Sequence, residues 1–324
     1  MNHRVPLKRK HRTRSRLLGE LPVDREFRQE VVDEYFQSNA GYWRSVYRER
    51  NLTGSIYQQR QAAALSLVDG LGLPEESNVL EIGCGAGVMT EALARRKFVV
   101  HAIDRVNASL ELVHRRAVEA GLKNRIFTGI GDVHALDFRD QSFDLVLALG
   151  VLPWLHSPRT AMMEISRVLR PGGSAIMTVD NRWRLNHILD PRFNHLLSPV
   201  RDALRSTAES LRLRTPGFRP SFPRMHSIKE FDDLLESMGL HKSSGLTLGF
   251  GPFTFMGKRV FPDSLGKIVN RCLQQMADWK IPGIRYAGSH YIVVTQKPGP
   301  GTQQRTRRHE PSVRKEQHQS GINR

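Results

Sequence analysis

The sequence contains only two cysteines among its 324 residues, Cys84 and Cys272. They lie far apart in the chain, and Cys84 stands among glycines, so they do not form the closely spaced pattern of a disulfide-stapled domain. We therefore expect a protein of a reducing compartment whose fold depends on a hydrophobic core. A content of 39% hydrophobic residues is sufficient for such a core.

Long apolar runs are also missing. The longest candidate, residues 145–155, contains Gly150 and Pro153 and is much shorter than the roughly 20 residues needed to cross a bilayer. The basic N-terminal residues are not followed by an apolar segment, which argues against a secretory signal peptide. The sequence thus predicts a cytoplasmic protein without an integral membrane segment.

Positive charge is abundant and unevenly placed. The formal net charge is +17, and residues 1–20 and 299–324 together supply +10 of it. Both segments are polar and lack periodic apolar positions, so we expect two disordered basic tails. One interpretation is weak contact of these tails with RNA or an anionic membrane surface; the other is solvated tails that affect only solubility.

Residues 78–87 form the most informative pattern. An apolar run at 78–82 predicts a buried parallel strand, and it breaks into three glycines at alternate positions, Gly83, Gly85 and Gly87. Apolar residues at helical spacing follow over 88–97, so the order is strand, tight turn, helix. The dinucleotide pattern Gly-x-Gly-x-x-Gly is absent, because Val88 occupies the place of its third glycine.

An acidic residue, Glu81, stands two positions before this turn, where its carboxylate suits a cationic ligand better than a pyrophosphate. An acid, one residue and then Gly-x-Gly-x-Gly resembles the first motif of the class I S-adenosylmethionine-dependent methyltransferases. The resemblance implies that S-adenosylmethionine is the cofactor. It also implies that the cofactor is held by Glu81, Gly83, Gly85 and Gly87.

Asp104 ends the next predicted strand, at 98–103, about 20 residues beyond the glycine turn. An acidic residue at this position typically binds the hydroxyls of a ribose, and the resemblance implies the same role here. Arg105 and Val106 follow it, and one of the two is expected beside the adenine.

The third and fourth predicted strands, at 125–130 and 143–149, complete the cofactor site. Asp132 follows the third strand, and the resemblance implies that it binds the adenine amino group. The backbone N–H of Val133 then meets the adenine ring. Leu149, at the end of the fourth strand, is the last expected cofactor contact, and no metal site is expected.

Alternating strands and helices from 78 to 179 predict an α/β fold with a doubly wound, Rossmann-like sheet and ligands at the carboxyl ends of its strands. The resemblance implies seven strands, of which the last two, 245–250 and 291–296, form an antiparallel hairpin. The expected methyltransferase domain spans 75–298. It carries insertions at about 181–226 and 251–289.

Residues 21–74 are expected to form an N-terminal helical cover, with helices at 25–47 and 57–71. Aromatic residues crowd one part of it. Tyr42, Trp43 and Tyr47 are candidate substrate contacts, with packing of the cover onto the core as the alternative. Trp154, after the fourth strand, is a further candidate for contact with the substrate.

His156 is the candidate general base for a hydroxyl acceptor, because the segment after the fourth strand lies beside the methyl group in the resembled class. Asp180 and His187 are weaker candidates. The helical cover is similar to that of quinone-precursor and porphyrin-precursor O-methyltransferases. Quinone enzymes, however, have Glu-His where this chain has Pro153 and Trp154.

The sequence therefore predicts a methyltransferase that acts on a small, partly apolar acceptor, at oxygen. Methylation of a base amino nitrogen through an Asn/Asp-Pro-Pro-Tyr motif is excluded, because the motif is absent after the fourth strand. An RNA or protein methyltransferase that uses its basic tails is one alternative. A non-catalytic cofactor-binding module is the other, and the sequence does not predict an oligomeric state.

Overall fold

The computed structural model describes residues 32–210 and 223–299. The predicted tails at 1–20 and 299–324 lie outside the described residues, except for Gly299. Across the two described ranges, no helix combines the length and apolar character needed to cross a membrane.

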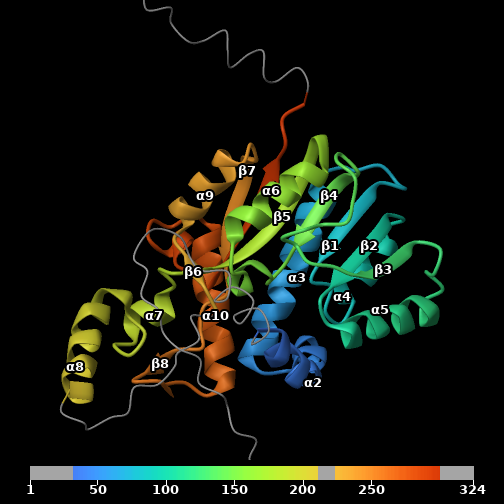
Figure 1. The fold of residues 1–324 in the computed structure, drawn as a ribbon. Helices are drawn as coiled ribbons and strands as arrows, with labels where there is room; N and C mark the ends of the chain where they lie inside the picture. The colour runs from blue at the N-terminus through green and yellow to red at the C-terminus, as the bar shows by residue number, and fades with distance from the viewer. Residues whose placement is uncertain (1–31, 211–222, 300–324) are drawn as a thin grey trace, which may run out of the picture.

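The described residues are organised around a central sheet of eight strands (Figure 1). In chain order the strands are β1 (Asn78–Ile82), β2 (Val99–Asp104), β3 (Ile126–Ile130), β4 (Phe143–Ala148), β5 (Leu169–Asn181), β6 (Met225–His226), β7 (His241–Leu248) and β10 (His290–Gln296). Their spatial order is β3-β2-β1-β4-β5-β10-β7, with the short β6 beside the end of β5. Strand β10 runs antiparallel to β5 and β7, while the other pairs of this sheet are parallel. The predicted sheet and its antiparallel hairpin are confirmed, and β6 is an addition.

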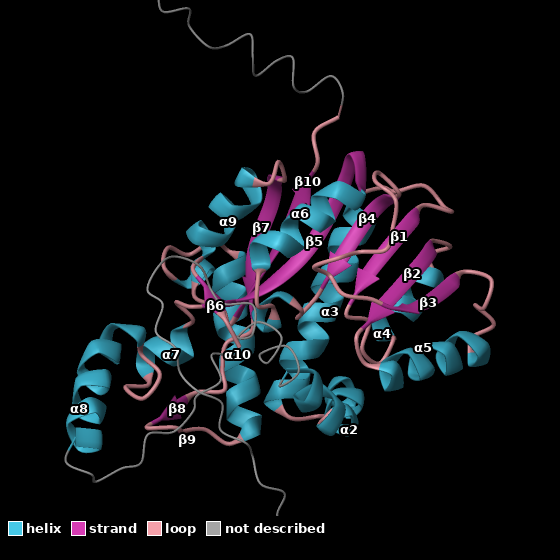
Figure 2. Cartoon of the chain, in the orientation of Figure 1, coloured by secondary structure: helices cyan, strands magenta, loops and turns pink. Residues whose placement is uncertain are grey.

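Helices cover both faces of the sheet (Figure 2). They are α3 (Leu52–Gly70), α4 (Val88–Ala94), α5 (Asn107–Glu119), α6 (Pro158–Val168) and α9 (Ile228–Ser237). One buried cluster joins the sheet to α6 and α9 through Met162 and Phe231. The other joins it to α3, α4 and α5 through Val68, Leu93 and Val113. The sheet is therefore doubly wound, as predicted.

Two predicted bounds within this region were wrong. The helix expected over 88–97 ends at Ala94, and Lys97 beyond it has a left-handed φ of 66°. The strand expected over 245–250 is β7, which begins at His241 and ends at Leu248. Strand β5 begins at Leu169. It pairs with β4 through a register shift between Phe143 and Leu145, which accommodates the extra residues.

The N-terminal cover differs from the single long helix expected at 25–47. Its described part consists of a helix at 32–38, α2 (Ala40–Ser45) and a 3₁₀ turn, η1 (Val46–Arg48). Helix α3 begins at Leu52, five residues before the predicted start, because the Asn51 side chain accepts a hydrogen bond from Gly54 N (2.8 Å). Asparagine caps of this kind act locally, and apolar spacing alone does not reveal them.

Both predicted insertions carry secondary structure. The first contains α7 (Leu185–Leu189), a 3₁₀ turn η3 (His195–Leu197) and α8 (Ser198–Ser210), and the second contains β8 (Thr254–Phe255), β9 (Lys258–Arg259), α10 (Asp263–Asp278) and η4 (Ile284–Tyr286). They are joined by Asp190, whose carboxylate accepts hydrogen bonds from Thr254 Oγ1 (2.5 Å) and Gly257 N (3.0 Å). Figure 2 shows α7, α8 and α10 at the same end of the sheet as α2.

Candidate active site

The three glycines after β1 all adopt the left-handed conformation, with φ of 69°, 49° and 73° at Gly83, Gly85 and Gly87. Two of them also lie close to side chains of other segments. A Cβ at Gly83 would lie 2.5 Å from Val151 Cγ2, and one at Gly87 would lie 2.9 Å from Val113 Cγ2. Only glycine fits a positive φ together with such close contacts, so the predicted tight turn is confirmed in its physical detail.

Asp104, at the end of β2, is tied to this turn. Its Oδ2 accepts a hydrogen bond from Gly85 N (2.9 Å), and its Oδ1 accepts one from Val106 N (2.9 Å). Burial raises the pKa of its carboxyl group, although hydrogen bonds from the backbone of Val106, Gly85 and Arg105 oppose that effect. Because each carboxylate oxygen has two acceptor positions, the side chain retains capacity for ligand hydroxyls.

Glu81 lies buried at the end of β1, with only 5% of its surface exposed. Its carboxyl group accepts a hydrogen bond from Thr90 Oγ1 on α4 (2.5 Å). Burial raises its pKa to about 8, and the nearby charge of Asp104 acts in the same direction. A cationic ligand in the pocket would favour the ionised carboxylate, so this group fits the positively charged cofactor that the sequence predicts.

These groups line one pocket of about 250 Å³ at the carboxyl ends of the parallel strands. The predicted residues among its lining are Glu81, Gly83, Gly85, Asp104, Arg105, Asp132, Val133, Leu149, Trp43, Tyr47, Trp154 and Asp180. The lining does not include Gly87, Tyr42 or His156. Gly87 is instead the N-cap residue of α4, and Tyr42 is 42% exposed.

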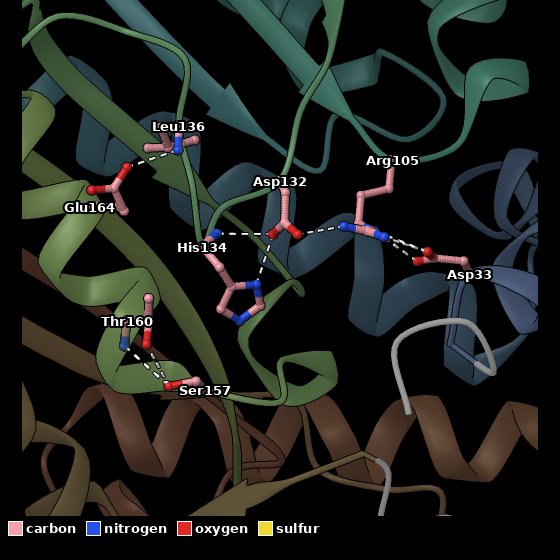
Figure 3. A network of polar contacts seen from close by, with 8 residues as sticks. All are labelled: Asp33, Arg105, Asp132, His134, Leu136, Ser157, Thr160 and Glu164. Carbon is pink, nitrogen blue, oxygen red and sulfur yellow. Dashed lines mark hydrogen bonds and ion pairs between the residues drawn. The ribbon is translucent and has the colours of Figure 1, made fainter. Parts of the chain in front are cut away.

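A chain of polar contacts runs from the N-terminal cover to the loop after β3 (Figure 3). Arg105 pairs with Asp33 of the N-terminal cover (2.8 Å) and with Asp132 (2.5 Å). Asp132 also accepts a hydrogen bond from the backbone N of His134 (2.9 Å) and contacts its Nδ1 (2.7 Å). Burial alone would raise the pKa of Asp132, but His134 and Arg105 lower it to about 2. The network thus holds the cover against the loops that follow β2 and β3.

His156 lies next to this network. Its imidazole stacks on that of His134, with ring centroids 3.8 Å apart. Of the other two base candidates, Asp180 lines the pocket, whereas His187 is outside its lining and stacks on Phe193. The structure therefore brings Asp180 to the pocket and leaves the imidazoles of His156 and His187 outside the lining.

Arg60 is a pocket residue that the sequence reasoning missed. Although only 6% exposed, it makes one hydrogen bond within the described residues, from its NH2 to the Tyr47 hydroxyl (2.9 Å). Its guanidinium lies over the ring of Tyr57 (4.5 Å) and within 3.5 Å of a Cβ built on Gly150. A signal was present in the sequence, because Arg60 interrupts a buried stripe of α3 whose other members are Ile56, Ala64 and Val68.

His290 is the second missed pocket residue. It begins β10, about 230 residues from Arg60 in the chain, and its Nδ1 lies 3.2 Å from Asp180 Oδ1. Both members of the pair line the pocket. No cluster that could hold a metal ion occurs in the part of the chain that the structure describes.

The sheet order, the glycine turn and the acid at the end of β2 define a nucleoside-binding domain of the doubly wound α/β class. Comparison with known proteins adds a family match. Residues 80–177 match the family model described as a methyltransferase domain. Over this region the chain is similar to class I S-adenosylmethionine-dependent methyltransferases, whose cofactor is S-adenosylmethionine.

Two curated relatives are O-methyltransferases. The chain is 29% identical to a ubiquinone biosynthesis O-methyltransferase of Paracidovorax citrulli, over 36% of this chain and 50% of the relative. It is 38% identical to a malonyl-[acyl-carrier protein] O-methyltransferase of Halorhodospira halophila, over 30% of this chain and 33% of the relative. The chain thus spans half or less of the length of these two relatives.

A solved structure resembles a larger part of the chain. Magnesium protoporphyrin IX methyltransferase from Synechocystis PCC 6803, with bound SAH, aligns with a TM-score of 0.55 and 14% identity. The alignment covers 83% of this chain and 99% of that one. At this identity the likeness confirms the fold.

Proposed function

We propose that this protein is an S-adenosylmethionine-dependent O-methyltransferase that acts on a small, partly apolar acceptor. The main support is that a buried acidic residue, Glu81, and a buried arginine, Arg60, both lie in the lining of one pocket. The names of the curated relatives support transfer to oxygen. Both the small, partly apolar acceptor and oxygen as the methylated atom belong to this proposal.

The charges at this end of the pocket match an α-amino acid. Within the described residues neither Glu81 nor Arg60 forms an ion pair, although the charges of Arg60 and Asp180 interact at longer range. Glu81 and Arg60 are not hydrogen-bonded to each other. The ammonium and carboxylate groups of the methionine moiety would give each side chain a charged partner. Asp104 would bind the ribose hydroxyls, while Asp132 and Val133 would contact the adenine.

When bound, the cofactor supplies a methyl group on a positively charged sulfur. The leaving sulfur becomes neutral, so little acid catalysis is needed, and most of the rate must come from alignment and exclusion of water. Rings of Phe36, Trp43 and Trp154 line the pocket and can exclude water from it. These side chains also give the acceptor an apolar surface.

Arg60→Met is expected to weaken S-adenosylmethionine binding about 10- to 100-fold, because hydrogen bonds to charged groups contribute about 1.5–3 kcal/mol. Isothermal calorimetry measures this change. Methylthioadenosine, which lacks the amino-acid group, should bind the variant as well as the wild type. Arg95→Met, at the exposed C-cap position of α4, is the matched control. An equal loss for both ligands would assign Arg60 a purely structural role.

Cofactor affinity is expected to depend on pH through Glu81. Its carboxyl group is mostly protonated below its pKa of about 8, and a cationic ligand binds best to the ionised form. Affinity should therefore rise up to tenfold per unit between about pH 6 and pH 8 and then level off, with release of a proton on binding. Calorimetry in buffers of different ionisation enthalpy measures both effects. A Glu81→Gln variant should bind more weakly and without this pH dependence.

Incubation with methyl-labelled S-adenosylmethionine and cell extract tests the reaction itself. We expect label in small organic molecules, as base-stable ethers or base-labile esters. Label mainly in RNA or protein, lost after removal of residues 1–20 and 299–324, would contradict the proposal and favour a macromolecular acceptor. Tight cofactor binding without any transfer would indicate a non-catalytic module.

A further inference from the structure

The pocket contains a histidine–aspartate pair that the cofactor site does not use. Asp180 and His290 are directly opposite each other in the antiparallel pairing of β5 and β10. Their side chains meet at 3.2 Å, and both reach the pocket lining. Since two interior strands of the sheet fix their positions, the orientation of the imidazole is set by the backbone and needs no loop movement.

The surroundings of the pair keep the carboxylate ionised. Burial alone would raise the pKa of Asp180, but the hydrogen bond from His290 and the charges of Arg184 and Arg60 lower it below its ordinary value. An ionised carboxylate accepts a hydrogen bond from Nδ1–H, and in the neutral form of an imidazole held this way Nε2 is the acceptor. Within the described residues, Nε2 of His290 makes no hydrogen bond.

The neighbouring phenol is unsuited to accept a proton. The ring centroids of Tyr57 and His290 are 6.0 Å apart, and the guanidinium of Arg60 lies over the Tyr57 ring at 4.5 Å. Burial raises the pKa of Tyr57 to about 12, and Arg60 offsets this only in part. Tyr57 is therefore a neutral hydroxyl near pH 7 and does not serve as a base there.

We propose that His290 is the general base of the reaction, that Asp180 is its positioning residue, and that the acceptor presents an aromatic hydroxyl to Nε2. This inference rests on the proposed methyl transfer. It assigns to His290 the role that the sequence suggested for His156. The aromatic class of the acceptor follows from the rings in the lining, Phe36, Trp43, Tyr57 and Trp154, which offer flat surfaces for stacking.

The step balances without a further reactant. The acceptor hydroxyl gives its proton to Nε2 of His290 while its oxygen forms the new bond to the methyl carbon. The carbon–sulfur bond breaks, and its electron pair stays on sulfur, which becomes a neutral thioether. The imidazolium that forms is stabilised by Asp180 and later releases its proton to water.

Two acceptors that differ in acidity test the assignment. Catechol has hydroxyls that are neutral at pH 8, whereas the nitro group of 4-nitrocatechol makes one hydroxyl acidic enough to be ionised there. The wild type is expected to methylate both. His290→Gln should slow transfer to catechol by about 100-fold or more and transfer to 4-nitrocatechol by less than about tenfold, since an ionised acceptor needs no base. Asp180→Asn should show the same selectivity.

His241→Gln is the matched control, because His241 is an exposed histidine that pairs with Gln296 at the far end of β10. Calorimetry must show that each variant still binds S-adenosylmethionine. Equal losses for both acceptors, or no loss, would overturn the role of His290. A wild type that binds the cofactor but methylates neither acceptor would overturn the aromatic-hydroxyl assignment and leave the proposed methyl transfer standing. Absence of cofactor binding would instead contradict the proposed function.

Discussion

Asp104→Ala is expected to weaken S-adenosylmethionine binding by at least about 100-fold, because hydrogen bonds to a charged group contribute about 1.5–3 kcal/mol each. The carboxylate has two tasks. It would bind the ribose hydroxyls of the cofactor, and it also accepts hydrogen bonds from Gly85 N and Val106 N. Its loss would therefore remove ligand contacts and leave two backbone donors of the ligand-binding loops without an acceptor.

Calorimetry on the folded variant measures the loss. Asp137→Ala is the matched control, because Asp137 is an exposed aspartate of the loop between β3 and β4. Asp104→Asn separates the two tasks, since the amide oxygen still accepts one backbone hydrogen bond while the charge is gone. Wild-type affinity in a folded Asp104→Ala protein would remove this residue from the cofactor site.

Gly83→Ala is expected to have an effect of similar size. The added methyl group would meet Val151 Cγ2 at 2.5 Å, and the backbone has a φ of 69° at that residue. Strain of this kind costs about 1–3 kcal/mol, and relief of the clash requires a shift of the segment after β4, which lines the pocket. We expect a lower melting temperature and a loss of cofactor affinity of about 100-fold.

Gly121→Ala is the control for backbone strain alone, because Gly121 also has a φ of 69° but a Cβ there has no neighbour within 4 Å. It should lower stability and leave cofactor affinity unchanged. Combining Gly83→Ala with Val151→Ala should restore part of the affinity, since the clashing atom is removed. If Gly83→Ala bound the cofactor as the wild type does, the close packing of this turn would not be part of the site.

The sequence predicted the part of the fold with strong local signals. Strand β1, the glycine turn and the acid at the end of β2 are defined by residues within 30 positions of each other, and the structure places them together. The capping box that Ser227 and Glu230 form at the start of α9 is a local signal of the same kind. In each of these cases, spacing along the chain is sufficient to specify the local geometry.

The rest of the site depends on tertiary contacts. Arg60 and His290 meet in one pocket only because α3 packs against the sheet and β10 inserts between β5 and β7. Nothing in the local sequence of His290 indicates Asp180 as its partner, since the two residues pair across strands 110 positions apart. For the same reason, the sequence favoured His156. This residue follows closely after the fourth strand in the chain, but its imidazole stacks on that of His134 in the structure.

Titration of the purified full chain with S-adenosylmethionine and with S-adenosylhomocysteine, followed by calorimetry, tests the central claim most directly. We expect saturable binding of one molecule of either ligand per chain. Because both ligands carry the α-ammonium group, each should release a proton at pH 7 as Glu81 ionises. A folded chain that gives no saturable heat with either ligand would contradict the account.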